Sequence, residues 1–274
     1  MVNYGLIGLF LIVFNIFTLF LKIHPFDYWY NATNWLGFIL FLDYLIYKKK
    51  GNSLLHNPIL AVQTFILSII LWLVVDLYNF LLSQNWYYVN FPYPEFLFFM
   101  IIISEILPSI VESVEFANLY FPFKIKIRKI NISKKIVFIL FSLSMIFIFI
   151  VTFWELFELT VPILLVSLFL FSDSLNFLLK KKSFIGDLSN GNLTRLISSL
   201  IGGYIVGIYW ELFNLKLVNW VYNIIPAFDY IFPYLNLSLL RIPSHIWIGC
   251  AIGYVGFYSM FLLIQNILKN NKEG

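Results

Sequence analysis

The stretch ILAVQTFILSIILWLVVDLYNFLLS, residues 59–83, is apolar almost throughout and contains one charged side chain, that of Asp76. About 20 apolar residues in a helix suffice to cross the hydrocarbon core of a bilayer, so this stretch predicts a transmembrane helix. Similar apolar stretches predict further spans at about residues 4–22, 34–47, 96–119, 135–153, 160–179, 195–215 and 243–268. We therefore expect an all-α, polytopic helical membrane protein of about eight transmembrane helices.

The composition agrees with a membrane protein, since 61% of the 274 residues are hydrophobic, 12% are charged and the mean hydropathy is +0.87. The surface of a soluble domain needs more polar residues than this. The single cysteine, Cys250, excludes an internal disulfide, and His24, His56 and His245 lie too far apart in the sequence for a familiar metal motif. Nucleotide-binding glycine motifs are also missing from the sequence. We expect no metal and no cofactor.

Basic residues are distributed unevenly between the predicted loops. The chain has 18 Lys and Arg residues, and fifteen of them follow the even-numbered predicted helices, within residues 48–50, 124–135, 180–195 and 269–272. The segments after the odd-numbered helices hold only Lys22, Lys216 and Arg241. Cytoplasmic loops carry an excess of Lys and Arg, so both termini are expected in the cytoplasm and the aromatic loops outside. The expected location is the cell (plasma) membrane.

An internal repeat divides the chain. The motif DLYN, residues 76–79, followed by NWYY, residues 85–88, returns about half the chain later as ELFN, residues 211–214, followed by NWVY, residues 219–222. Shorter matches pair Pro108-Ser109 with Pro243-Ser244, and the stretch Asp43–Lys50 with Asp173–Lys182. These ordered matches predict two tandem four-helix membrane repeats, residues 1–132 and 133–274. An even number of helices makes the repeats parallel, with a site expected between them.

Ionisable side chains at membrane depth are costly, so each is a candidate for function as well as for a structural hydrogen bond. Asp76 shares a helix face with Asn79, and Glu211 shares one with Asn214. Each pair can therefore bind a substrate or lock neighbouring helices together.

The fourth predicted helix carries three acids on one face, Glu105, Glu112 and Glu115. Glu105 is expected near the bilayer centre, whereas Glu112 and Glu115 approach the cytoplasmic end, where water can solvate them. The eighth predicted helix offers Arg241 and His245 instead. We expect Arg241 to face Glu105 between the repeats, as a structural pair or as a substrate clamp.

Aromatic side chains belong to both repeated motifs: Trp86 and Tyr88 in the first, Trp220 and Tyr222 in the second. Such residues suit a belt at the membrane–water interface. They equally suit an aromatic-lined pocket for substrate.

The residues after each motif suggest a family. Residues 92–99 read PYPEFLFF and residues 226–232 read PAFDYIF, so Glu95 and Asp229 stand in matching places. With the preceding acid and W-x-Y, this pattern resembles the units of small integral-membrane lycopene cyclases, in which an acid precedes W-x-[YF] and then P-x-E-E-x-x-F-F. This chain keeps only the second acid of the E-E pair, and its repeats hold four spans instead of three.

The resemblance implies acid catalysis on a carotenoid or another isoprenoid without a cofactor. In such a cyclase or isomerase, a carboxylic acid in an apolar site protonates a double bond, and aromatic faces stabilise the resulting cation. The candidate acids here are Glu95, Asp229, Asp76, Glu211 and Glu105.

Two further function classes remain open. A transporter or proton-coupled carrier is favoured by the parallel repeats and by the midplane carboxyl of Glu105. A non-enzymatic membrane assembly factor is compatible with the short loops. The expected partners are membrane lipid or an apolar small-molecule substrate, and identical or different chains in a membrane oligomer. Topology and lipid headgroups explain the basic residues, so no nucleic acid is expected.

Overall fold

The computed structural model of this chain describes residues 3–121, 123–153, 159–223 and 244–270. Its long helices are α1 (Tyr4–Leu21), α2 (Tyr30–Lys50), α3 (Pro58–Tyr78), α4 (Glu95–Tyr120), α5 (Lys134–Phe153), α6 (Thr160–Leu178), α8 (Thr194–Leu217) and α10 (Ser244–Asn270). The short elements are the π-helical turn η1 (Asn79–Ser83), the helix α7 (Phe184–Ser189), and the strands β1 (Trp86–Tyr88) and β2 (Trp220–Tyr222). A helix thus occupies each range expected from the sequence, and the second is longer than the expected 34–47.

Six helices in the described part of the chain are long and apolar enough to cross a membrane: α1, α3 with η1, α4, α5, α6 and α8. The apolar part of α10 is shorter, Ala251–Ile267. Large apolar side chains are exposed on α1, α3 and α5, among them those of Phe10, Ile66 and Phe149. Continuous exposed apolar faces are rare on proteins surrounded by water, so we assign these faces to lipid. The expected all-α membrane fold is confirmed at this level.

Local signals in the sequence determine where α2 ends and where α3 begins. The backbone N–H of Gly51, which adopts φ 73°, donates to the carbonyl of Tyr47 at 2.7 Å and closes α2. The side chain of Asn57 then accepts from the N–H of Leu60, and Pro58 occupies the first helical position. These are the residue types that favour a helix C-terminus and a helix N-terminus, respectively.

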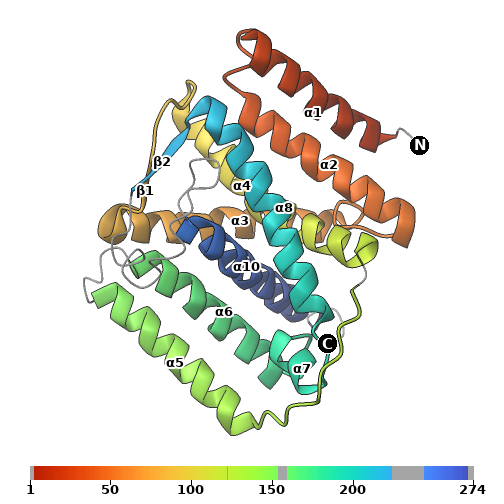
Figure 1. Ribbon diagram of the computed structural model, residues 1–274, viewed down its shortest axis with the longest axis vertical. Helices are drawn as coiled ribbons and strands as arrows, with labels where there is room; N and C mark the ends of the chain where they lie inside the picture. The colour runs from red at the N-terminus through yellow and green to blue at the C-terminus, as the bar shows by residue number, and fades with distance from the viewer. Residues whose placement is uncertain (1–2, 122, 154–158, 224–243, 271–274) are drawn as a thin grey trace.

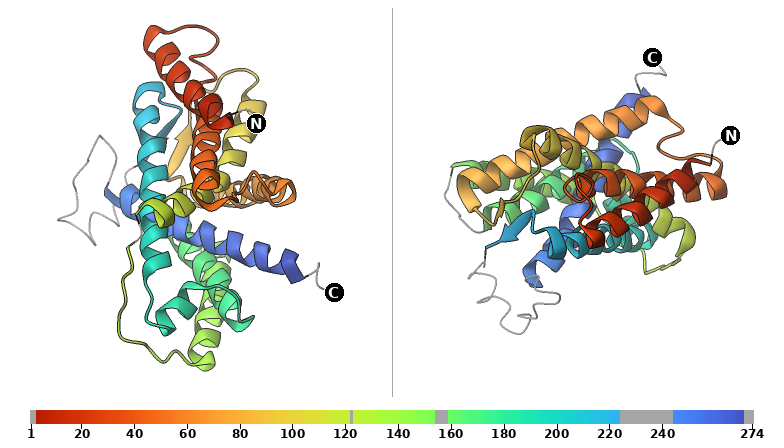
Figure 2. Two further views of the ribbon diagram at one scale, coloured as in Figure 1. Left: turned by 90° about the vertical axis from the view of Figure 1, so that its right-hand side faces the viewer. Right: turned by 90° about the horizontal axis from the view of Figure 1, so that it is seen from above.

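The two halves of the chain follow the same packing order. In the first half, α1 packs against α2, and both α2 and α3 pack against α4. In the second half, α5 packs against α6, and both α6 and α8 pack against α10. Contacts between α4 and α8 join the halves. Figure 1 and Figure 2 show α1 and α5 at opposite edges of the molecule, with α4, α8 and α10 between them.

The helix α4 is the most enclosed of the six candidate spans. Pro108 lies inside it, where a proline lacks the N–H that a helix needs and pushes the preceding turn apart. The hydroxyl of Ser68 on α3 donates to the carbonyl of Ile103 at 2.6 Å and accepts from the N–H of Leu107 at 2.9 Å. One side chain of a neighbouring helix therefore satisfies two backbone groups next to the proline, which allows this part of α4 to remain in an apolar core.

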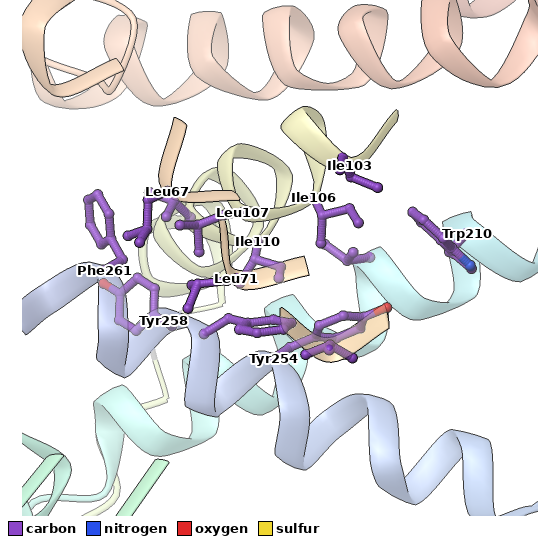
Figure 3. Packing of buried hydrophobic residues seen from close by; sticks show 14 of the residues in the cluster. Leu67, Leu71, Ile103, Ile106, Leu107, Ile110, Trp210, Tyr254, Tyr258 and Phe261 are labelled. Carbon is purple, nitrogen blue, oxygen red and sulfur yellow. The ribbon is translucent and has the colours of Figure 1, made fainter. Parts of the chain in front are cut away.

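A single hydrophobic cluster connects the halves. Figure 3 shows side chains of α3, α4, α8 and α10 pointing toward one another, including Leu71, Ile110, Trp210 and Tyr254. Close approach of α4 and α8 depends on Gly202, because a Cβ there would lie 2.6 Å from the backbone nitrogen of Val114. The two halves are therefore held by backbone-to-backbone packing as well as by large side chains.

One expected match between the repeats falls partly outside the described residues. Pro108-Ser109 lies inside α4, whereas Ser244 is the first described residue of α10 and Pro243 lies outside the described residues. The match therefore stays a prediction.

Candidate functional site

The repeated motifs form one antiparallel ribbon at one end of the bundle, which we call the ribbon end. Trp86 pairs with Tyr222 and Tyr88 pairs with Trp220. The two copies of the sequence motif are thus hydrogen-bonded partners in space, although they lie in opposite halves of the chain.

Asn79 holds the start of this ribbon in the first half. Its Oδ1 accepts from the N–H groups of Asn85 at 2.8 Å and Trp86 at 3.3 Å, and its Nδ2 donates to the carbonyl of Trp86 at 2.8 Å. Asn214 makes the corresponding three bonds in the second half, to Asn219 and Trp220, at 3.0, 3.2 and 3.0 Å. Both asparagines therefore shape the chain at the turn between helix and strand.

The acids of the motifs are paired within their own half. The hydroxyl of Tyr88 donates to both carboxyl oxygens of Asp76, at 2.9 and 3.0 Å, and the indole of Trp86 donates to the same group at 3.2 Å. Burial raises the pKa of Tyr88 well above its usual range, so its hydroxyl remains a donor. The hydroxyl of Tyr222 donates to Glu211 in the same manner. These contacts hold each strand against the helix that precedes it. They agree with a structural role for the two acids, which was one of the two roles expected from the sequence.

The remaining sequence candidates are scattered. Glu95 is exposed in the first turn of α4, so it does not occupy the apolar site that acid catalysis requires. Glu105 is 4% exposed, and its Oε2 has no hydrogen-bond partner within the described part of the chain. Asp229 and Arg241 lie outside the described residues, and of His245 only the backbone, in the first turn of α10, is described. The expected pairing of Glu105 with Arg241 therefore also lies outside the described residues.

A cavity of about 920 Å³ lies at the opposite end of the bundle, which we call the pocket end. The residues that line it come from both halves of the chain and include three bases and three acids: Lys50, Glu112 and Glu115 from the first half, and Lys182, Asp187 and Arg195 from the second. By the distribution of basic residues, this end is the one expected in the cytoplasm.

Each half contributes one ion pair to the cavity wall. Lys50 Nζ lies 2.8 Å from Glu115 Oε2, and Arg195 Nε lies 3.2 Å from Asp187 Oδ2. Burial raises the pKa of Asp187, and the positive charge of Arg195 opposes this shift. The Nη1 atom of Arg195 is buried and has no hydrogen-bond partner among the described residues. The wall thus retains an unused cationic donor.

Each half also places a buried aspartate at the pocket end. Asp43 on α2 accepts from the N–H of Leu55 at 2.8 Å. Asp173 on α6 accepts from the N–H groups of Phe184 at 2.7 Å and Ile185 at 2.8 Å. Each aspartate therefore caps the segment that follows its own helix.

The sequence contained a signal for this pair of sites. Ser53-Leu54-Leu55 follows Asp43 at the same spacing at which Ser183-Phe184-Ile185 follows Asp173. The match between Asp43–Lys50 and Asp173–Lys182 ended before these residues, so the caps were missed.

Glu112 differs most from the expectation. The sequence placed Glu112 toward the cytoplasmic end, where water can solvate it, but Glu112 is 1% exposed. Its carboxyl group lies next to the side chain of Asp43 and the backbone of Leu54. Its position on α4 follows from the packing of α4 against α2, which brings Glu112 beside Asp43.

Comparisons with protein families, curated proteins and solved structures find no match to this chain. Within the described residues, no group of three or more His, Cys, Asp or Glu side chains is arranged to hold a metal ion. The candidate site is therefore the cavity at the pocket end, with its charged wall and the buried Asp43–Glu112 pair.

Proposed function

We propose that this chain is a carrier of small polar solutes, with eight transmembrane helices in two tandem four-helix repeats related by an axis along the membrane normal. The cavity between the halves is the single observation that carries this proposal. A solute site at the interface between repeats is the arrangement that secondary transporters use.

The repeat is supported by three structural parallels. The halves share their packing order, their Asn79 and Asn214 bonds, and their aspartate caps at Asp43 and Asp173. In this arrangement α2 and α10 cross the membrane together with the six more apolar helices. Their polar residues then face the protein interior, where partners replace water.

The charges in the wall define the solute class. Lys182 and Arg195 can bind an anionic group, while Glu112 and Glu115 can bind a cationic group or a hydrogen-bond donor. A hydrocarbon in this cavity would leave the buried Nη1 of Arg195 and the buried Oε2 of Glu112 without partners, which is costly. We therefore propose a small solute that carries charges of both signs, such as an amino acid or a short peptide.

Uptake into liposomes tests this proposal. Purified protein in liposomes should accumulate labelled amino acids or dipeptides from a mixed panel, with glucose and choline as probes that lack one or both charges. Arg195→Met should reduce uptake strongly, because the solute's anionic group loses its partner, whereas Lys129→Met in an exposed loop should not. Uptake of no zwitterion in the panel, with the protein shown to be folded, would count against this function.

A lipid enzyme is the second candidate, and Glu105 is the observation that favours it. This carboxyl lies in the apolar core with an unpartnered oxygen, as an acid that protonates an isoprenoid double bond requires. The resemblance to lycopene cyclases points the same way. Protein extracted in mild detergent should then retain an isoprenoid, and Glu105→Gln should abolish its conversion while Glu95→Gln, at an exposed position, should not.

Membrane orientation is a separate part of the proposal. In a Cys250→Ser background, Tyr87→Cys at the ribbon end and Lys129→Cys at the pocket end place single thiols at exposed positions. An impermeant thiol reagent added to intact cells should label only the Tyr87→Cys protein. Labelling of only the Lys129→Cys protein would show that the orientation is the opposite of the one proposed.

A further inference from the structure

The pair formed by Asp43 and Glu112 has the geometry of a shared-proton site. The two side chains are 0% and 1% exposed, and their carboxyl groups lie next to each other. Two buried carboxylates side by side repel each other, whereas a proton on one of them lets that group donate to the other.

The surroundings indicate which group holds that proton. Asp43 Oδ1 accepts from the N–H of Leu55 at 2.8 Å, and Asp43 Oδ2 accepts from the hydroxyls of Tyr4 at 2.7 Å and Ser53 at 2.9 Å. Three donors to one carboxyl suit its ionised form. The proton therefore belongs on Glu112.

Glu112 also reaches the cavity. It lines the cavity wall, and its Oε2 is buried without a hydrogen-bond partner among the described residues. A buried polar atom without a partner is uncommon in proteins and calls for an explanation. A ligand or a proton entering from the cavity provides that partner.

The second half shows that the fold does not need this carboxyl. Asp173 accepts from the hydroxyl of Ser259 at 3.4 Å, and Ser259 on α10 stands where Glu112 stands on α4, because each is the helix residue next to the capping aspartate. A serine hydroxyl donates at every accessible pH, whereas a carboxylic acid donates only while protonated. Glu112 thus adds a titratable group to a scaffold that works without one.

A chain of hydrogen bonds leads from this pair toward water. The Nδ1 atom of exposed His56 lies 2.8 Å from the hydroxyl of Ser53, which donates to Asp43 at 2.9 Å. The ring of His56 stacks on that of Tyr47, with centroids 3.6 Å apart. Gly186 follows Asp173 at the same spacing at which His56 follows Asp43, so the second half lacks this chain of hydrogen bonds as well.

Other charged groups near the pair are already engaged. Glu115, one turn along α4, is paired with Lys50 of α2 and accepts from the hydroxyl of Tyr258 of α10 at 3.3 Å. Across the cavity, Arg195 of α8 is paired with Asp187 of α7. Tyr4 of α1 is bound to Asp43 itself. Lys182 also lines the cavity, and its positive charge acts on Asp187. Among the described carboxyl groups of the cavity wall, Glu112 is thus the one without an ion-pair partner.

We propose that Asp43 and Glu112 form a proton-binding site in the cavity wall. One proton is shared by the two carboxyls and exchanges with water through Ser53 and His56. On release, the proton passes from Glu112 to water, either along the contact of Ser53 with His56 or directly in the cavity. Coupling of this proton to solute movement rests on the proposed carrier function, but the site itself does not.

A hydrophobic carbodiimide tests the site directly. This reagent adds to a protonated carboxyl in a water-poor environment, and the carboxyl then becomes a stable N-acylurea with no group lost. In folded protein in liposomes, peptide mass spectrometry should find the adduct on Glu112, decreasing as the pH rises. Glu112→Ser, which copies the second half, should lose the adduct and keep its thermal stability.

A matched variant guards against a folding artefact. Ser259→Glu should create a second labelled carboxyl beside Asp173. His56→Ala should retain labelling of Glu112 but slow its response to a pH jump. Absence of label on Glu112 at low pH, or equal label on Asp173 in the unaltered protein, would overturn the proposal.

The two proposals fail separately. Solute uptake by the unaltered protein tests the carrier function, whatever the labelling result. If uptake occurs, it should depend on the proton gradient in the unaltered protein and lose this dependence in Glu112→Ser. Gradient dependence that survives in Glu112→Ser would reject the assignment of coupling to this pair.

Discussion

The two halves of the molecule differ at the pocket end far more than at the ribbon end. At the ribbon end, Asn79 and Asn214 make the same three bonds, and each motif acid binds a tyrosine of its own strand. At the pocket end, Asp43 and Asp173 both cap a following segment, but only Asp43 is joined by a second carboxyl. The halves therefore share a scaffold and differ in chemistry, so the unshared groups are the ones to examine for function.

The largest expected effect is a difference in stability loss between substitutions of the two capping aspartates, Asp43 and Asp173. Asp173→Ala leaves the buried N–H groups of Phe184 and Ile185 unpaired, at about 1–3 kcal/mol each. Asp43→Ala leaves one such N–H, that of Leu55, and releases two hydroxyls that can rotate to other partners. Thermal unfolding in detergent should show the greater loss for Asp173→Ala. The reverse order would show that the Asp43 network, and not the shared cap, stabilises the fold.

The next largest effect on stability concerns the contact between α4 and α8, which joins the two halves. Gly202→Ala places a methyl group 2.6 Å from the backbone of Val114, which must move, so we expect a loss of about 2 kcal/mol. Gly203→Ala is the matched control, because its added Cβ meets only the side chain of Tyr254, at 3.2 Å. Thermal unfolding measures both. Equal losses would mean that α4 and α8 can separate without cost.

At the ribbon end we expect substitutions in the two halves to cause equal losses of stability. Asn79→Ala and Asn214→Ala each remove three hydrogen bonds to backbone groups at the start of a strand, so each should cost about 1–2 kcal/mol. Neither should alter solute uptake per folded molecule. A large drop in uptake for only one of them would assign function to the ribbon end and contradict the comparison.

The smallest expected effect is a pH dependence at Asp187. Burial raises its pKa in the folded protein above that in the unfolded chain. Its contribution to stability is therefore fully present below the unfolded pKa and is lost as the pH rises through the folded pKa. Asp187→Asn should reduce the pH dependence of the unfolding temperature across this acidic window by a small amount, because the side chain of Asp187 is partly exposed to solvent. Identical pH profiles of the two proteins would contradict the shift.

The sequence by itself determined the long apolar helices and the residues that share a face within them. Runs such as residues 59–83 favour a helix long enough to cross a membrane, because a helix satisfies its own backbone groups without water. Spacing within one helix likewise placed Asp76 and Asn79 on one face. These are short-range constraints, and neighbouring residues carry them.

Only the tertiary structure decided which polar groups meet. The packing of α2 against α4 buries Glu112 next to Asp43, although the sequence placed it toward the cytoplasmic end, where water can solvate it. Glu95 on the same helix is exposed. The same packing lets Ser68 satisfy the helix beside Pro108. Helical periodicity shows that residues share a face but not what that face meets, because contacts between helices depend on how distant segments pack.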